Sequence, residues 1–152
     1  MTPPEQIADP SPADILETIT KAVFQAGMSW RVVEAKWPGF REAFDGFDPE
    51  RVAALTPDDV ARLKEDTRII RNGRKIEATV HNAEAIVAVD QDTPGGIRGW
   101  LGSRGGFEET IDAMRKEFKF LGDMGAYYVL HVIGEPVPDH QEAMHLLSGR
   151  KR

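Results

Sequence analysis

Apolar residues recur at helical spacing over nearly the whole chain. The first run follows the segment Ser11-Pro12-Ala13-Asp14, which combines a capping serine, a proline in the first turn and a carboxylate three residues after the cap. The apolar positions that then share one helical face are Ile15, Leu16, Ile19, Ala22, Val23 and Ala26. Gly27 follows as a helix terminator. The pattern therefore predicts a helix that begins after Ser11 and ends at Gly27.

Similar patterns predict most of the remaining chain to be helical. Ser29 can cap a second helix that carries Trp30 and Trp37, and Pro38 is expected to end it. Thr56 opens another capping box. Further apolar runs with helical spacing occupy residues 49–55, 76–87, 107–118 and 125–133. No strand alternation persists anywhere, so the sequence predicts an all-α fold of short, irregularly packed helices.

Composition narrows the class of protein without changing this picture. The chain has 152 residues, with 41% apolar and 29% charged residues, which fits one globular domain over residues 1–152 with a loose arm at residues 1–11. Because cysteine is absent, disulfides and cysteine-built zinc sites are excluded, and the expected compartment is the cytoplasm. No apolar run approaches the roughly 20 residues of a membrane span, and the polar start of the chain is not a signal peptide.

The charges are distributed unevenly along the chain. A formal net charge of −6 counts against a nucleic-acid-binding protein, because phosphate binding draws on lysine and arginine. Local clusters matter more than the total, and one cluster precedes the long apolar run at residues 76–87. Its members are Arg68, Arg71, Arg74 and Lys75. These side chains are expected either to meet a phosphate backbone or to form an ordinary solvated basic face.

A glycine-containing connection between two apolar runs is a candidate anion site. Gly122 and Gly125 stand three residues apart after Phe118. Glycines allow the tight turn of a helix–hairpin–helix motif, and the free N–H groups of the next helix could bind a phosphate, with Lys119 adding positive charge. The alternative is a plain glycine-rich connection without a ligand.

Two further side chains could carry chemistry. Asp139 could stabilise a cationic sugar or activate water, and it could also cap the helix expected over residues 141–147; the two roles are compatible. Trp30, which follows Gly27 and begins a helix, could stack on an extruded base or could belong to the core.

No metal or cofactor is predicted. The histidines lack cysteine partners, and His140 and His145, five residues apart, suit one helix face poorly. No phosphate-binding loop or dinucleotide fingerprint is present.

The order of several motifs resembles the DNA-3-methyladenine glycosylase I family, over residues 15–140. The motifs are Gln25-Ala26-Gly27-Met28-Ser29-Trp30, Phe40-Arg41-Glu42-Ala43-Phe44, residues 47–53, residues 69–76 with Asn82-Ala83, residues 118–122 and Asp139-His140. Members of this family belong to the helix–hairpin–helix glycosylases, which flip an alkylated adenine out of the duplex and cleave its N-glycosidic bond.

The resemblance implies an all-α, helix–hairpin–helix glycosylase fold and a site for each step of that reaction. The partner would be double-stranded DNA with a damaged base, bound by a monomer. The residues implied at the base pocket are Trp30, Gln25 and Phe24. The residues implied in DNA binding are Lys119, Gly122, Gly125, Arg71, Arg74 and Lys75. Asp139 would be the catalytic carboxylate that stabilises the oxocarbenium-like transition state.

The chain departs from the family pattern at several points. Family members begin with a further stretch that holds a cysteine, a histidine and pocket aromatics, which this sequence lacks. Their glutamate that contacts the flipped base corresponds to Ala22. Of their four zinc ligands only His140 matches, and Met144 replaces the last cysteine, so a zinc-free protein is expected. These departures leave the recognised base open. They also leave two alternatives: a DNA-binding relative without catalysis, and a helical protein with another ligand in the same pocket.

Overall fold

The computed structural model describes residues 5–150 and confirms the all-α fold. Within this range the chain forms nine α-helices, one 3-10 turn and no strand. The helices are α1 (Pro12–Gln25), α2 (Trp30–Ala43), α3 (Pro49–Ala53), α4 (Pro57–Leu63), α5 (Gly73–Asp92), α6 (Gly96–Gly102), α7 (Phe107–Glu117), α8 (Asp123–Val132) and α9 (His140–Ser148), and the 3-10 turn η1 is Asp45–Phe47. Among the residues described, no helix is long and apolar enough to cross a membrane.

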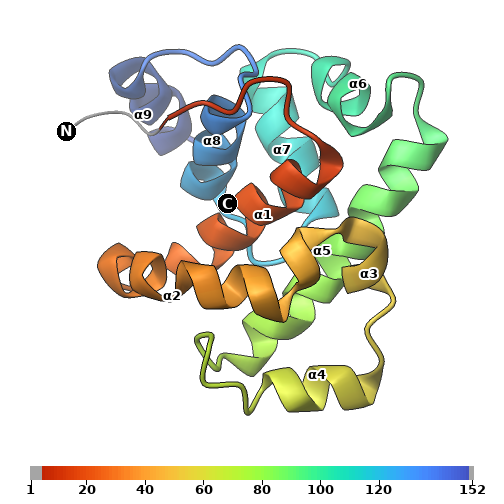
Figure 1. The fold of residues 1–152 in the computed structure, drawn as a ribbon. Coiled ribbons are helices and arrows are strands. Elements are labelled where there is room, and N and C mark those ends of the chain that lie inside the picture. Colours follow the sequence, from red (N-terminus) through yellow and green to blue (C-terminus); the bar gives the residue numbers. More distant parts are fainter. Residues whose placement is uncertain (1–4, 151–152) are drawn as a thin grey trace.

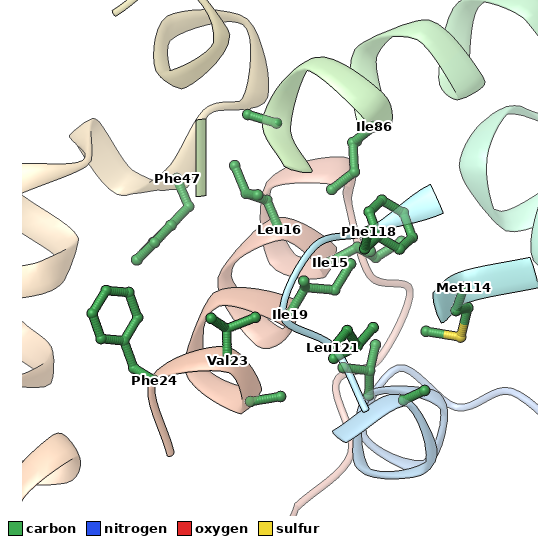
Figure 2. Packing of buried hydrophobic residues seen from close by; sticks show 14 of the residues in the cluster. Ile15, Leu16, Ile19, Val23, Phe24, Phe47, Ile86, Met114, Phe118 and Leu121 are labelled. Carbon is green, nitrogen blue, oxygen red and sulfur yellow. The ribbon is translucent and has the colours of Figure 1, made fainter. Parts of the chain in front are cut away.

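Helix α1 lies at the centre of the molecule, between α2 and α3 on one side and α7 and α8 on the other (Figure 1). Figure 2 shows buried side chains on both sides of this helix: Phe24 and Phe47 lie on one side, and Met114 and Leu121 lie on the other. One cluster of buried side chains therefore extends through α1, and it joins the aromatic contacts of α2 to the hairpin between α7 and α8.

Capping boxes fix where two helices begin, as the sequence predicted. The Ser11 hydroxyl accepts a hydrogen bond from the N–H of Asp14 at 3.1 Å, and the Asp14 carboxylate accepts one from the N–H of Ser11 at 2.9 Å. Thr56 and Asp59 form the same reciprocal pair at the start of α4. Each box satisfies backbone N–H groups that have no partner inside the helix.

Helix α2 continues through Pro38, where the sequence predicted an end. The proline removes one backbone N–H and therefore one helical hydrogen bond. The buried rings of Trp37 and Phe40, on either side of it, stack with centroids 4.7 Å apart. The Trp37 indole also donates to Glu17 Oε2 of α1 at 2.8 Å. Tertiary contacts thus hold both halves of α2 in place and override the local preference of proline.

Helix α6 was not predicted from the sequence, because its glycines lower the helical propensity of the segment. Burial of Ile97 and Leu101 holds this helix against the core. A Cβ atom on Gly99 would lie only 2.3 Å from the carbonyl oxygen of Pro94, so this close approach requires glycine.

Candidate functional site

Three helix ends meet beside the turn between α1 and α2. Lys75 lies in the first turn of α5, and its ammonium donates to the carbonyl oxygen of Ala26 at 2.7 Å and to that of Phe24 at 3.3 Å. Phe24 is in the last turn of α1, and Ala26 follows that helix directly. At the start of α8, a Cβ atom placed on Gly125 would lie 3.6 Å from the Cβ of Ala22. The C-terminus of α1 and the N-termini of α5 and α8 therefore converge on one region of the molecule.

The hairpin that joins α7 to α8, residues 118–122, is anchored from α5. The buried side-chain amide of Asn82 donates to the carbonyl oxygen of Lys119 at 3.2 Å and accepts from the Lys119 N–H at 2.8 Å. The neighbouring His81 Nε2 lies 3.3 Å from the carbonyl oxygen of Glu117. These contacts tie the backbone of the hairpin to the long helix α5.

The N-terminus of α8 is open to an anion at Gly122. This residue stands at the N-cap position and offers no side-chain cap, so the first N–H groups of α8 have no capping oxygen from it. The carboxylate of Asp123, in the first turn, is buried and pairs with Arg115 at 3.0 Å, which offsets its charge. A surface hollow of about 510 Å³ opens here, and its lining consists of Arg115, Lys116, Phe118, Lys119, Phe120, Leu121 and Gly122.

Basic side chains of the hairpin and of α5 lie close enough to the Glu77 carboxylate to interact with its charge. The pKa of the exposed Glu77 carboxyl is lowered, chiefly by its hydrogen bond and ion pair with Lys64 and also by the charges of Lys119 and Arg74. Lys119, Arg71 and Arg74 are exposed, and none of them forms an ion pair with another described residue. Lys119 of the hairpin and Arg74 of α5 therefore lie on one basic face, which also contains the carboxylate of Glu77.

The structure removes two members of the basic cluster from that face. Lys75 is only 8% exposed, and its ammonium is bound to the carbonyl oxygens at the end of α1. Burial lowers the pKa of this lysine. Arg68 pairs with Asp66 and Glu42. The ammonium of Lys75, which was predicted to contact phosphate, is thus bound inside the protein in this structure.

The residues expected at a base pocket divide into exposed and buried ones. Trp30, at the start of α2, is 59% exposed, which excludes a core role for its ring. It follows a turn in which Gly27 has φ 74°, a backbone conformation that favours glycine. Gln25 is half-buried. Phe24 is completely buried, with its ring edge-on to Phe40 at 4.8 Å, so it is a core residue rather than an open pocket wall.

Asp139 is exposed and caps α9. Its Oδ1 accepts a hydrogen bond from the N–H of Glu142 at 2.8 Å. The phenol of Tyr127 donates to the carbonyl oxygen of Pro138 at 3.3 Å. Burial raises the pKa of Tyr127, and the nearby Asp139 carboxylate raises it further. The predicted capping role is confirmed, and neither Asp139 nor Trp30 lines the hollow at the hairpin.

Metal-binding groups do not gather at this site or elsewhere in residues 5–150. No three histidine, aspartate or glutamate side chains of that range lie close enough to share an ion.

Comparison with known proteins places these observations in a family. Residues 9–103 match the methyladenine glycosylase family. The chain belongs to this family. The resemblance recognised from the ordered motifs is thereby confirmed.

Two curated relatives are similar to one part of the chain. DNA-3-methyladenine glycosylase 1 of Escherichia coli K12 is 44% identical over 68 residues, which are 45% of this chain and 36% of that protein. DNA-3-methyladenine glycosylase of Haemophilus influenzae is 40% identical over 67 residues, which are 44% of this chain and 36% of that protein. The matched region thus spans little more than a third of the length of each relative.

The structural likeness extends further along the chain. The solution structure of 3-methyladenine DNA glycosylase I, whose study concerns alkylated base recognition, has a TM-score of 0.70 and 29% sequence identity. The similarity covers 91% of this chain and 82% of that protein. It therefore includes the greater part of the fold beyond residue 103, where the family match ends.

Sequence reasoning missed three residues of this region. Asn82 was noted only as part of a family motif, although it anchors the hairpin. Phe120 was likewise noted only within the motif at residues 118–122, and its exposure depends on the tertiary structure. Glu77 carried no recognisable signal, because its proximity to Lys119 depends on the tertiary structure.

Proposed function

We propose that this protein is a DNA glycosylase that hydrolyses the N-glycosidic bond of an alkylated or otherwise damaged base in DNA. The observation that carries the proposal is the family match over residues 9–103, joined by a fold similar to 3-methyladenine DNA glycosylase I. Double-stranded DNA with a damaged base is the proposed substrate, a monomer the proposed form, and the cytoplasm the proposed compartment because the DNA substrate would be found there.

The hairpin and α5 supply the proposed grip on the duplex. The first N–H groups of α8, after Gly122, suit one phosphate oxygen, and the exposed ammonium of Lys119 suits a neighbouring phosphate. Arg74 extends the same face along the start of α5, and the exposed Arg71 precedes this helix in the chain. Although the chain has a net charge of −6, a polyanion that approaches this face would meet a local cluster of positive charges.

Cleavage of the N-glycosidic bond needs only modest catalysis when the base is already cationic, because a cationic base is a good leaving group. As the bond between C1′ and the base nitrogen breaks, its electron pair leaves with the base and neutralises it, and positive charge develops on the sugar. The Asp139 carboxylate is proposed to stabilise that charge. Water then adds to C1′ and loses a proton, which gives an abasic site and the free base. Trp30 and Gln25 are proposed to receive the extruded base.

The test is release of methylated bases from alkylated duplex DNA, with Asp139→Asn as the matched variant. Asparagine is as good an N-cap as aspartate, so the start of α9 and the melting temperature should be preserved. Loss of the charge should slow base release about 100-fold. If the parent protein released no base, the proposed glycosylase activity would be contradicted. If the parent and the variant released bases at the same rate, the proposed role of Asp139 would be contradicted.

A DNA-binding relative without catalysis is the second candidate. It is favoured by Ala22, which lies against the start of α8 and has only a methyl group where the family resemblance implies a glutamate. This candidate expects salt-dependent binding to duplex DNA that weakens in Lys119→Ala, with no base release from any alkylated substrate.

A further inference from the structure

Phe120 is an exposed aromatic residue in a backbone conformation that phenylalanine rarely adopts. Its φ is 60°, in the left-handed region, and its side chain is 51% exposed. A bulky residue in this region is strained, and such strain persists only where the surrounding structure imposes it. The ring of Phe120 does not compensate for this by full burial, so burial of this side chain does not explain why a phenylalanine stands here.

The surrounding structure fixes the hairpin on both sides of Phe120. Phe118 and Leu121 are buried and hold the two ends of the turn in the core (Figure 2). Asn82 holds Lys119 by hydrogen bonds to both its N–H and its carbonyl oxygen. With these three residues fixed, the turn leaves the side chains of Lys119 and Phe120 at the surface.

The surroundings of Phe120 favour a partner that combines negative charge with flat apolar faces. Lys116 and Lys119 line the same hollow as Phe120, and the uncapped start of α8 follows it at Gly122. Asp123, the acidic residue of that first turn, is paired with Arg115. Phosphates would meet the ammonium groups and the N–H groups, and a nucleobase would meet the ring.

We infer that Phe120 contacts DNA by stacking on a nucleobase, and that Asn82 is the positioning residue that holds it in place. The inference rests on the proposed function, since it assigns a further contact to the same DNA-binding face. Stacking on an aromatic ring tolerates any base sequence, because every base offers a flat face. The strained turn then serves DNA recognition. A substitution that relieves the strain should lower the affinity for DNA and leave the fold and its stability intact.

Substitutions at Phe120 test the inference. Asparagine and glycine accept the left-handed conformation, so Phe120→Asn and Phe120→Gly should keep or raise the melting temperature. Binding to a short duplex with one abasic-site analogue should weaken about tenfold in both, whereas Phe120→Tyr, which keeps the aromatic face, should bind like the parent. In duplexes that carry 2-aminopurine at one position after another around the analogue, at least one position should change its fluorescence on binding of the parent and the tyrosine variant, but not of the other two.

Each possible outcome of these measurements either supports or overturns the inference about Phe120. Equal affinity and equal fluorescence change in the parent and in Phe120→Asn would overturn the inference while leaving the proposed function intact. A tyrosine variant as weak as the asparagine variant would also overturn it, because the aromatic face would then be irrelevant. A parent protein that fails to bind the duplex at low salt would overturn the inference together with the proposed function. The expected pattern, with stability retained and affinity lost, is one that a merely structural phenylalanine would not give.

Discussion

Two turns of this protein force a phenylalanine into the left-handed backbone conformation, with opposite results for its ring. In the turn that links α2 to α3, Phe47 has φ 60° and follows Asp45 and Gly46, which also have positive φ. In the hairpin between α7 and α8, Phe120 has the same φ. Phe47 is completely buried, whereas Phe120 is half exposed.

The difference shows how strain is compensated in the two places. The Phe47 ring stacks on Trp37 and on Phe44, each with centroids 5.5 Å apart, and its burial offsets the roughly 1–2 kcal/mol that a left-handed residue costs. The Phe120 ring stacks on no other aromatic ring among residues 5–150, and its turn is held instead by its neighbours and by Asn82. The first turn buries its aromatic ring in the core, and the second leaves its ring at the surface.

The largest effect is expected from Phe47→Ala. Removal of a fully buried aromatic ring should lower the free energy of unfolding by about 3–5 kcal/mol. Urea denaturation would measure this, with Phe120→Ala as the control for loss of an aromatic ring at the same φ. Similar losses in the two variants would remove the distinction between the turns.

Asn82→Ala should affect both stability and binding. The Lys119 N–H and carbonyl oxygen would lose their partners, at a cost of about 1–3 kcal/mol in the free energy of unfolding. DNA affinity of the folded variant should fall as well, because the hairpin would no longer hold Phe120 in its present conformation. Denaturation and a DNA titration, done at a temperature where the variant is folded, would measure the two effects. An unchanged affinity would show that the hairpin does not need this anchor.

Lys75 and Lys119 extend the comparison of buried and exposed residues to charge. Burial lowers the pKa of Lys75 in the folded protein, whereas the unfolded chain keeps the ordinary value of 10.5. Between the two values the unfolded state binds more protons, so the contribution of Lys75 to the free energy of unfolding rises with pH in this alkaline window. The difference in stability between the parent and Lys75→Met should therefore change with pH there.

The control for that experiment is Lys119→Met. This exposed lysine packs outside the core, so its replacement should change the free energy of unfolding little, but its loss should reduce the salt dependence of DNA binding by about one phosphate contact. The opposite assignment, with Lys75→Met changing the salt dependence and Lys119→Met the stability, would contradict the assigned positions.

The smallest effect is expected from Glu77→Gln. This change removes the carboxylate that lies within the electrostatic reach of Lys64, Lys119 and Arg74. DNA affinity should rise about threefold at low salt and converge with that of the parent as salt screens the charge. Glu84→Gln, at an exposed position two turns further along α5, makes the same charge change and should have a smaller effect. Equal gains in the two variants would mean that net charge alone sets the affinity.

Much of the fold could be predicted from local sequence signals. Ser11, Thr56 and Asp139 cap helices as expected, because capping depends on residues within one turn of each other. Pro38 was misjudged, because the packing of Trp37 and Phe40 that carries α2 through it is not a local property.

The candidate site was less predictable than the fold. The hairpin glycines and Lys119 were found from their spacing, and the ordered motifs identified the family. The cluster of basic residues ahead of α5 could not be divided by sequence alone, since Lys75 and Arg74 are adjacent and yet one is buried and the other exposed. Phe24 and Trp30 differ in the same way: Phe24 is buried and Trp30 is exposed. The chain changes direction at Gly27, between the two residues, and this turn decides which of them reaches the core.

The sequence by itself determined the all-α class, most helix starts and the family, because these depend on periodicity, on caps and on ordered motifs. The tertiary structure alone decided which side chains reach the surface at the meeting point of α1, α5 and α8. There the Asn82 amide meets a backbone 37 residues away, and Lys75 reaches back 49 residues to Ala26. Contacts over such distances in sequence leave no periodic signal, and they are what bury Lys75 and leave Phe120 exposed.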